Sequence, residues 1–335
     1  MSTVIRSPNW IGDGVMCLPA IRAWKNLFPA ERLAVAARRY LVDIFQNIPE
    51  IDEVIALPQG HAGLAGAGAL REKRFGRGIL FTNSFSSALL FRLAGIHSLA
   101  GYASDGRGWM LSDKVARADD AAHHQFYYLN IVERLAGHKA GGAFPANLVV
   151  TRMESEQAGA WLQELGIAPD RPLLALAPTA AYGSAKAWLP ARFRAFVQAW
   201  TGSHADAAVL LFGAASERAA IAELAAGLPG TIRNLAGSLD LRRAIAVLSR
   251  CRLFVGNDSG LMHVAAALSV PLVAVFGPTE PGRTAPLAAR FRLLHHGADC
   301  APCRHRECPS DRRCMAAVSV AEVLAAADEL WAENA

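Results

Sequence analysis

LFVGNDSGLMHVAAALSVPLVAVF, residues 253–276, is the stretch that decides the fold of this chain. A short apolar run at 253–255 leads through a turn of small residues into a helical pattern at 260–268, and a second apolar run follows at 272–276. Short uninterrupted apolar runs are typical of strands covered on both faces, as in parallel sheets. The stretch therefore predicts two parallel strands joined by a helix, the βαβ unit of α/β proteins.

A membrane-spanning alternative for this region is excluded by the residues that interrupt it. No Lys, Arg, Asp or Glu occurs from Ser259 to Thr279, so a hydropathy window would score the segment as a span. His263, Pro271 and Pro278 break the apolar run and fit a helix followed by a strand. The first residues, MSTVIRSP, lack the basic start and apolar stretch of a signal peptide. We therefore expect no transmembrane span and a cytoplasmic protein.

Outward from residues 253–276, the alternation of strand and helix patterns continues over the whole chain. Further strands are predicted at residues 3–6, 33–37, 53–57, 78–82, 173–177, 208–212 and 231–235. Further helices are predicted from after Asp13 to Leu27 and at residues 40–47, 84–94, 123–136, 154–165, 190–200, 216–226, 240–249 and 320–331. Because each crossover helix returns the chain to the same edge of a sheet, this order predicts two doubly wound, Rossmann-like α/β domains.

The length agrees with two domains. At about 150 residues per domain, 335 residues correspond to two. We place the boundary between residues 167 and 168, although the helix at 154–165 could belong to either side. The last helix is long enough to cross back to the first domain. Ligands of such sheets bind beyond the carboxyl ends of the strands, and two facing domains would add a cleft between them.

Composition and charge indicate a folded chain with a mild preference for anionic partners. Hydrophobic residues make up 53% and charged residues 19%, and 34 Lys and Arg against 29 Asp and Glu give a net charge of +5. One basic run carries Arg71, Lys73 and Arg74 before a predicted strand. Such runs usually form a solvated face, but together with Arg107 this one could meet an acidic acceptor. It lacks interleaved aromatic residues, so no nucleic-acid partner is expected.

Four of the six cysteines lie close together near the C-terminal end of the chain. Cys300, Cys303, Cys308 and Cys314 could supply the thiolates of a zinc or iron site. The second pair lacks the CxxC spacing of zinc modules, so reduced thiols or a disulfide remain the favoured alternatives.

The first strand ends in a junction that carries a carboxylate. RSPNWIGDG, residues 6–14, places Asp13 between two glycines that permit close approach of a substrate. Asp13 is a candidate general base. The alternative is that it only caps the following helix, as most Asp residues in that position do.

A second group of candidates follows the strands of the second half. Asp258, Ser259, Gly260 and His263 lie where the strand at 253–255 turns into a helix. Small residues there expose backbone N–H groups, which can bind an anion such as a diphosphate. The alternative is that Asp258 or Ser259 is an ordinary N-cap and that His263 only makes hydrogen bonds within its own helix region.

Two other junctions add charged and hydroxyl groups. Lys186, on a Gly/Ser loop, can act as a point charge against a phosphate, and the Thr179 hydroxyl can donate to the same group. Glu217 lies just inside a helix start and could accept ribose hydroxyls, or it could serve only as a favourable charge for the helix dipole.

Missing motifs narrow the chemistry further. No G-x-x-x-x-G-K-[ST] is present, which argues against P-loop phosphoryl transfer, and no Asp-x-Asp is present to hold a metal against a nucleotide diphosphate. A G-x-S-x-G elbow is absent as well. Gly66-Ala67-Gly68 meets Arg71 where a dinucleotide fingerprint has its third glycine, so a nicotinamide enzyme is not expected.

Three stretches together resemble the lipopolysaccharide heptosyltransferases of glycosyltransferase family 9, and within it the heptosyltransferase II subfamily. They are PNWIGDGVM at 8–16, LREKRFGRGILFTNSFSSALLFRLAGI at 70–96 and GNDSGLMHVAAALSVPLVAVFGPTEP at 256–281. The resemblance spans nearly the whole chain, including the Cys-rich stretch. It implies a GT-B fold, with residues 1–167 as the acceptor-binding domain and residues 168–335 as the nucleotide-sugar-binding domain.

The same resemblance implies an inverting, metal-independent transfer without a cofactor. The donor would be ADP-heptose carrying L-glycero-D-manno-heptose, and the acceptor a heptose on Kdo-lipid A at the inner face of the cytoplasmic membrane, which implies peripheral membrane contact. Asp13 would be the base, and Lys186 would act with Thr179 on the leaving diphosphate. Glu217 would hold the ribose. The sugar and diphosphate would be lined by Asp258, Ser259, Gly260 and His263.

One loop departs from the subfamily pattern. PTAAYGSAKAWLP at 178–190 stands where heptosyltransferase II usually has P-G-A-E-[FY]-G-P-A-K-R-W-P, so Thr179, Ala181, Ser184 and Ala187 differ and Leu189 is inserted. Thr179 is closer to the heptosyltransferase I pattern. The alternatives are therefore another family 9 transferase with a different donor or acceptor, or a GT-B sugar-nucleotide epimerase. A non-catalytic protein that binds nucleotide sugars is a further alternative.

Overall fold

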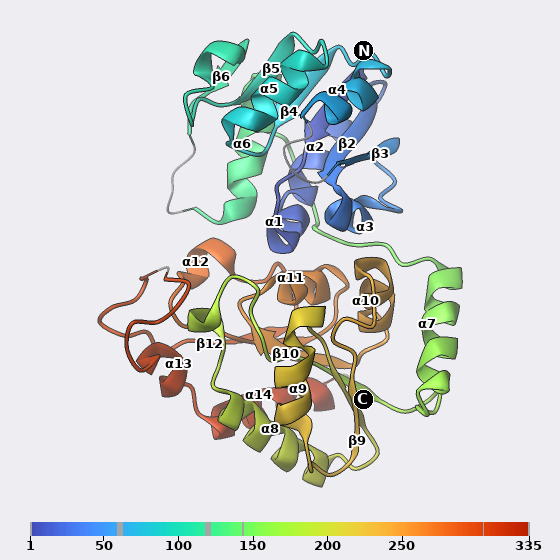
Figure 1. Cartoon of the computed structure of the whole chain (residues 1–335), viewed down its shortest axis with the longest axis vertical. Helices are drawn as coiled ribbons and strands as arrows, with labels where there is room; N and C mark the ends of the chain where they lie inside the picture. The colour runs from blue at the N-terminus through green and yellow to red at the C-terminus, as the bar shows by residue number, and fades with distance from the viewer. Residues whose placement is uncertain (1, 59–62, 118–121, 143, 304, 334–335) are drawn as a thin grey trace. The chain divides into compact units, whose positions relative to one another are not determined.

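The computed structural model describes residues 2–58, 63–117, 122–142, 144–303 and 305–333, and Figure 1 shows the whole chain. The chain divides into two compact units, Met1–Val149 and Val150–Ala335. Each unit contains one six-stranded parallel sheet. Helices cover both faces of each sheet, so the predicted α/β class with two doubly wound domains is confirmed.

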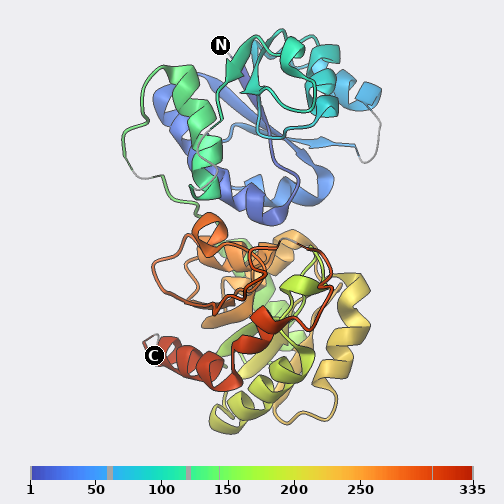
Figure 2. The same cartoon turned by 90° about the vertical axis from the view of Figure 1, so that its left-hand side faces the viewer.

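The first unit has strand order β3-β2-β1-β4-β5-β6. Its strands are β1 (Ser2–Arg6), β2 (Arg32–Arg38), β3 (Glu53–Leu57), β4 (Arg77–Leu80), β5 (Ser98–Tyr102) and β6 (Asp113–Val115). Its helices are α1 (Ile11–Met16), α2 (Leu18–Leu27), η1 (Arg39–Leu41), α3 (Val42–Phe45), α4 (Gly63–Arg71), α5 (Phe85–Leu93), η2 (Gly108–Met110) and α6 (His124–Ala136). In Figure 2, green α6 and blue α2 pack together on one side of the sheet, and α4 and α5 form a second pair on the other.

The second unit has strand order β12-β11-β10-β7-β8-β9. Its strands are β7 (Leu173–Ala177), β8 (Ala208–Leu211), β9 (Thr231–Asn234), β10 (Leu253–Asn257), β11 (Leu272–Val275) and β12 (Phe291–Leu294). Its helices are α7 (Arg152–Glu164), η3 (Ser184–Lys186), α8 (Pro190–Ser203), η4 (Ala215–Glu217), α9 (Arg218–Ala225), α10 (Leu241–Leu248), α11 (Gly260–Ala267), α12 (Pro281–Thr284), α13 (Arg313–Ala317) and α14 (Val320–Ala332).

Both sheets reverse their winding direction next to their first strand. From β1 the chain proceeds to β2 and β3 on one side and then returns to β4 on the other, and from β7 it proceeds to β8 and β9 before returning to β10. In open parallel sheets, ligands bind beyond the carboxyl ends of the strands at such a switch point. The topology therefore marks two places, after β1 and β4 in the first unit and after β7 and β10 in the second.

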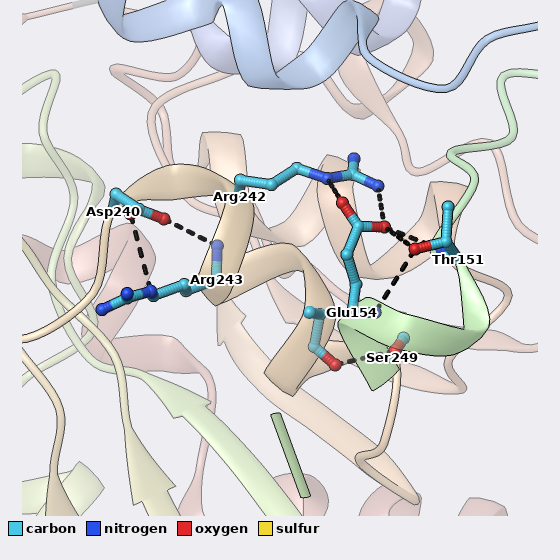
Figure 3. Close-up of polar contacts among 7 residues, drawn as sticks. Thr151, Glu154, Asp240, Arg242, Arg243 and Ser249 are labelled. Atoms are coloured by element: carbon cyan, nitrogen blue, oxygen red, sulfur yellow. Dashed lines mark hydrogen bonds and ion pairs between the residues drawn. The ribbon is translucent and has the colours of Figure 1, made fainter. Parts of the chain in front are cut away.

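Helix α7 accounts for a difference in the domain boundary. The sequence placed the boundary between residues 167 and 168, whereas the contacts divide the chain after Val149 because α7 packs against α10. Glu154 joins them: its carboxylate accepts from Thr151 N at 2.8 Å within the capping box of α7 and from Arg242 Nε at 2.6 Å on α10 (Figure 3). A pocket of about 680 Å³ lies beside this pair and contains none of the predicted site residues.

The last helix stays with its own sheet. The sequence allowed α14 to cross back to the first domain. In the structure its buried side, including Val323, Ala327 and Leu330, packs on α8 and on β10, β11 and β12. That apolar stripe at helical spacing needs a sheet to cover it, and the second sheet supplies one. Helix α14 thus covers the sheet of its own unit.

Short or polar elements escaped the sequence patterns. Strands β5, β6 and β12 were not predicted, and neither was helix α4, which contains Gly66 and Gly68. Strand β6 has three residues and β12 carries Arg292, so neither shows an apolar run long enough to be recognised. Over the described parts of the chain, no helix is both long enough and apolar enough to cross a membrane.

Candidate active site

Asp13 lies at the switch point of the first sheet. It is the third residue of α1, directly after β1, and it lines a pocket of about 270 Å³. The residues after β4, including Asn83 and Ser84, form another wall, and α6 contributes the rest. Helix α1 begins after Trp10 without a side-chain cap bond, so the structure does not support a capping role for Asp13.

Two side chains of α6 hold the Asp13 carboxylate. His124 Nδ1 lies 3.2 Å from Asp13 Oδ1, and both side chains are only partly exposed, 29% and 21%. The Tyr128 hydroxyl faces the same carboxylate; burial raises the pKa of this phenol well above its usual range, and the charge of Asp13 raises it further. The phenol therefore stays protonated and can donate to Asp13. The imidazole packs against Tyr127 and Tyr128, with ring centroids 5.3 and 5.4 Å apart.

This arrangement suits a proton acceptor. A carboxylate that faces a pocket and is fixed by neighbouring side chains can accept the proton of a bound hydroxyl group. Sequence reasoning missed His124 and Tyr128 because they lie more than a hundred residues from Asp13. The signal that could have found them is the cluster HHQFYY at 123–128, at the start of a predicted helix.

Arg107 supports the rim of the pocket and does not face it. Its side chain is completely buried, Nε donates to the Tyr102 carbonyl at 3.0 Å, and Nη1 donates to the Ser84 carbonyl at 3.4 Å. Burial lowers the pKa of this guanidinium. The expectation that Arg107 contacts an acceptor is therefore replaced by a structural role: it holds Ser84, which lines the Asp13 pocket.

Three further basic residues lie away from the pocket. Arg71, Lys73 and Arg74 precede β4 and so lie at the amino edge of the first sheet, opposite the edge that carries Asp13. Arg71 donates to the Leu93 carbonyl, and Lys73 pairs with Glu53. The structure does not bring these side chains together with Asp13. Their contact with an acceptor stays a prediction.

In the second unit, Lys186 and Asp258 form a partly buried ion pair at the switch point. Lys186 Nζ lies 2.6 Å from Asp258 Oδ2, and the side chains are 15% and 5% exposed. Thr279 Oγ1 donates to the same oxygen at 2.8 Å. The Lys186 ammonium also lies 5.1 Å from the centroid of the Tyr182 ring. Three loops, after β7, β10 and β11, therefore meet around one carboxylate.

Asn257 ties the loop after β7 to the end of β10. This buried side chain accepts from Trp188 N at 2.8 Å and donates to the carbonyls of Ala177 and Thr179 at 3.4 Å. The loop also needs glycine at position 183, because φ is +154° there and a Cβ would collide with the Arg306 backbone. Sequence reasoning named neither Asn257 nor Thr279 as a site residue, although both lie in motifs that it singled out.

The start of α11 presents backbone donors beside this ion pair. Ser259 is the N-cap, and its hydroxyl accepts from Met262 N at 3.4 Å. Gly260 is the first helical residue and has no side chain over the helix end. His263 is buried within α11, 4% exposed. Ser259 thus has the capping role foreseen as one alternative, while Asp258 acts as the counter-ion of Lys186.

Thr179 and Glu217 are near the same sheet edge with different partners. The Thr179 carbonyl accepts from Asn257, which places this residue in the loop after β7. The Glu217 carboxylate accepts from Ala214 N at 2.6 Å and so closes the turn after β8. This contact agrees with the alternative that Glu217 serves only the start of its helix. A contact of Glu217 with a ribose stays a prediction.

The four cysteines of the C-terminal cluster differ in exposure and are not joined by disulfides. Cys300 is exposed, Cys303 and Cys308 are partly exposed, and Cys314 is buried, and all four are free thiols. Among the residues described, no group of three or more His, Cys, Asp or Glu side chains is placed to hold a metal ion. Residue 304 lies outside the described residues.

Comparisons with known proteins match both units. A family model, glycosyltransferase family 9 (heptosyltransferase), matches residues 65–313. Lipopolysaccharide heptosyltransferase 2 of Salmonella typhimurium is 31% identical over 307 residues, which cover 88% of each chain. The enzyme of the same name from Escherichia coli is 31% identical over 317 residues, again 88% of each chain. The structure of E. coli ADP-heptose lipopolysaccharide heptosyltransferase II matches with a TM-score of 0.83 at 27% identity and covers 99% of both chains.

Proposed function

This chain belongs to glycosyltransferase family 9, the heptosyltransferases, and we propose that it transfers L-glycero-D-manno-heptose from ADP-heptose to the inner-core heptose of lipopolysaccharide. The names of its relatives supply the donor and acceptor classes. The proposal rests on the charged groups at the two switch points. The first unit has a fixed carboxylate, Asp13, and the second has a partly buried ammonium, Lys186.

We assign the donor to the second unit. Lys186 and the N–H groups at the start of α11 are oriented cationic and partial positive charges, which suit a diphosphate. In the unliganded protein, Asp258 neutralises Lys186. The donor phosphates must therefore compete with Asp258 for the ammonium, while Thr179, Ser259, Gly260 and His263 line the sugar and diphosphate and Glu217 holds the ribose.

We assign the acceptor to the Asp13 pocket. As the acceptor oxygen forms its bond to C1 of the donor heptose, Asp13 takes the hydroxyl proton. The bond from C1 to the diphosphate oxygen breaks on the opposite face of the sugar, and its electron pair leaves with ADP, so the configuration at C1 inverts. The negative charge that develops on ADP is stabilised by Lys186 and the α11 amides, an electrostatic effect worth about 3 kcal/mol per donor.

These protein groups can stabilise the leaving diphosphate without a metal ion or another cofactor, and we propose a metal-independent reaction. The proposed acceptor is a membrane lipid, so we also propose that the enzyme works from the cytoplasm at the inner membrane surface.

A second candidate function is that of a family 9 transferase with another donor or acceptor, such as heptosyltransferase I. One observation favours it. The loop at 178–190, which carries Lys186, departs from the heptosyltransferase II pattern.

A donor and acceptor panel tests the proposal. The purified protein is incubated with ADP-heptose and a heptosylated Kdo-lipid A acceptor, with and without EDTA, and products are identified by mass spectrometry. We expect one heptose to be added at an unchanged rate with EDTA. Thermal shifts with ADP- and UDP-sugars rank the donors, since a ligand at about 100 times its Kd adds about 2.7 kcal/mol of stability. Product formed from the donor alone would identify an epimerase or hydrolase instead.

A further inference from the structure

The first unit exposes an apolar surface along α5 and η2. Phe85, Leu89 and Leu93 are 41%, 38% and 36% exposed, and Trp109 is 73% exposed. The three α5 residues are spaced four apart and so lie along one face of the helix. The ring centroids of Phe85 and Trp109 lie 6.3 Å apart, which joins the two elements into one patch. We call these four residues the α5 surface.

The core does not require these side chains to be apolar. The opposite side of α5 already packs into the unit, because Ala88 and Phe91 are fully buried in its hydrophobic cluster. Helix α4 covers a further side of α5. Large apolar side chains on the remaining, exposed face of α5 add no packing to the core. Contiguous exposed patches of this kind mark sites of interaction.

Two guanidinium groups flank the α5 surface. Arg71 donates to the carbonyl of Leu93 at one end. Arg92 donates from Nε to the Met110 carbonyl at 2.8 Å and so lies beside η2, which carries Trp109. Over the described ranges of the chain, neither guanidinium has a carboxylate within ion-pair distance. Both positive charges remain available to an anionic partner.

This combination fits the headgroup region of a bilayer. Exposed Trp and Phe side chains with neighbouring Arg residues are the composition of interfacial anchors, in which the rings enter the acyl boundary and the cations meet anionic headgroups. The α5 surface also adjoins the candidate acceptor site, because Ser84 is the N-cap of α5 and lines the Asp13 pocket. An acceptor anchored in a membrane would therefore be presented next to the pocket.

We propose that the α5 surface docks the enzyme on a lipid bilayer that contains anionic lipids. The proposed function enters only as the reason why docking is useful, because the proposed acceptor is a membrane lipid. The insertion is shallow, and the apolar rings of Phe85 and Trp109 with the charges of Arg71 and Arg92 supply the affinity. Docking brings the Asp13 pocket to the lipid surface.

Co-sedimentation with vesicles tests the surface directly. The full chain is mixed with vesicles of phosphatidylcholine alone or of phosphatidylcholine with phosphatidylglycerol. We expect binding to the anionic vesicles, reduced at least about tenfold by the double change Phe85→Ser and Trp109→Ser. Arg71→Gln should weaken binding to the anionic vesicles alone, by about fivefold. Phe126→Ser is the matched control, because Phe126 is an aromatic residue of the same unit, 47% exposed, on α6 and outside the α5 surface.

Three results would overturn the proposal: no binding of the unmodified protein to anionic vesicles, equal binding by the double variant, or an equal loss in Phe126→Ser. A dimer that dissociates in the double variant, without vesicle binding, would instead identify the surface as a contact between two copies. The assay uses neither donor nor acceptor, so it does not depend on the proposed reaction. Transfer to a water-soluble acceptor without acyl chains should be unchanged in the double variant, which also verifies that it folds.

Discussion

His124 Nδ1 lies 3.2 Å from Asp13 Oδ1, although the two residues come from helices at opposite ends of the first unit's sequence. Helices α1 and α6 are in contact, which brings the imidazole over the carboxylate. Each carboxylate oxygen has two lone pairs, so the carboxylate can still receive a proton from an acceptor hydroxyl while His124 contacts Oδ1. His124 is in this view a positioning residue for Asp13, and Tyr128 is a second one.

The first prediction separates positioning from proton transfer. Asp13→Asn keeps the shape of the side chain but removes the base, and we expect transfer to be abolished while ADP-heptose binding stays intact. His124→Ala should lower kcat by about 10- to 100-fold, the cost typical of a misplaced catalytic group. KM for the donor should not change.

His124→Gln, which keeps a hydrogen-bond donor, should recover part of the loss, and added imidazole should partly rescue His124→Ala. Steady-state kinetics with each variant provides the measurement. A His124→Ala enzyme with unchanged kcat would show that the contact with Asp13 has no part in the reaction.

The second prediction concerns the charge of Lys186. Lys186→Ala should reduce kcat by about 100- to 1,000-fold, because an oriented donor to the leaving diphosphate is lost. The same change should weaken binding of ADP but leave adenosine binding unaffected, since adenosine has no phosphate to contact the ammonium. Isothermal titration with the two ligands makes this comparison. Equal losses for ADP and adenosine would place Lys186 outside the phosphate site.

The third prediction links pH to the attachment of α7. The hydrogen bond from Arg242, together with those within the Thr151 capping box, lowers the pKa of Glu154 to about 2 from its ordinary 4.5. A carboxyl group whose pKa is depressed by folding stabilises the protein above its unfolded value, and that stability is lost as the pH falls from about 4.5 towards 2. We therefore expect Glu154→Gln to destabilise the protein at pH 7 by about 1–2 kcal/mol, with the difference from the parent vanishing near pH 2.

Urea unfolding of parent and variant across this pH range is the test. Glu156→Gln is the matched control: Glu156 pairs with Arg152 in the same helix, but the two side chains are 63% and 92% exposed. Exposed pairs contribute little, so this variant should unfold like the parent. A pH-independent loss in Glu154→Gln would show that the ion pair does not hold α7 against α10.

The sequence alone determined the class of fold and the placement of most of the site. Uninterrupted apolar runs alternating with helical patterns allow few solutions other than parallel sheets covered by helices, because both faces of each strand must be buried. Polar residues directly after such strands, including Asp13, Lys186 and Asp258, then fall at the carboxyl edge where a site can form. Local periodicity is sufficient for both conclusions, since it depends on residues close in the chain.

Only the tertiary structure decided which side chains meet. The contact of His124 with Asp13, the link from Asn257 to the loop after β7 and the burial of Arg107 join residues whose separation leaves no periodic trace in the sequence. The basic run at 71–74 was assigned to the acceptor from its charge, but the direction of β4 places it at the opposite edge of the sheet. Charge and residue type are local properties, whereas the edge on which a residue lies is set by strand order and helix packing, which form only when distant segments assemble.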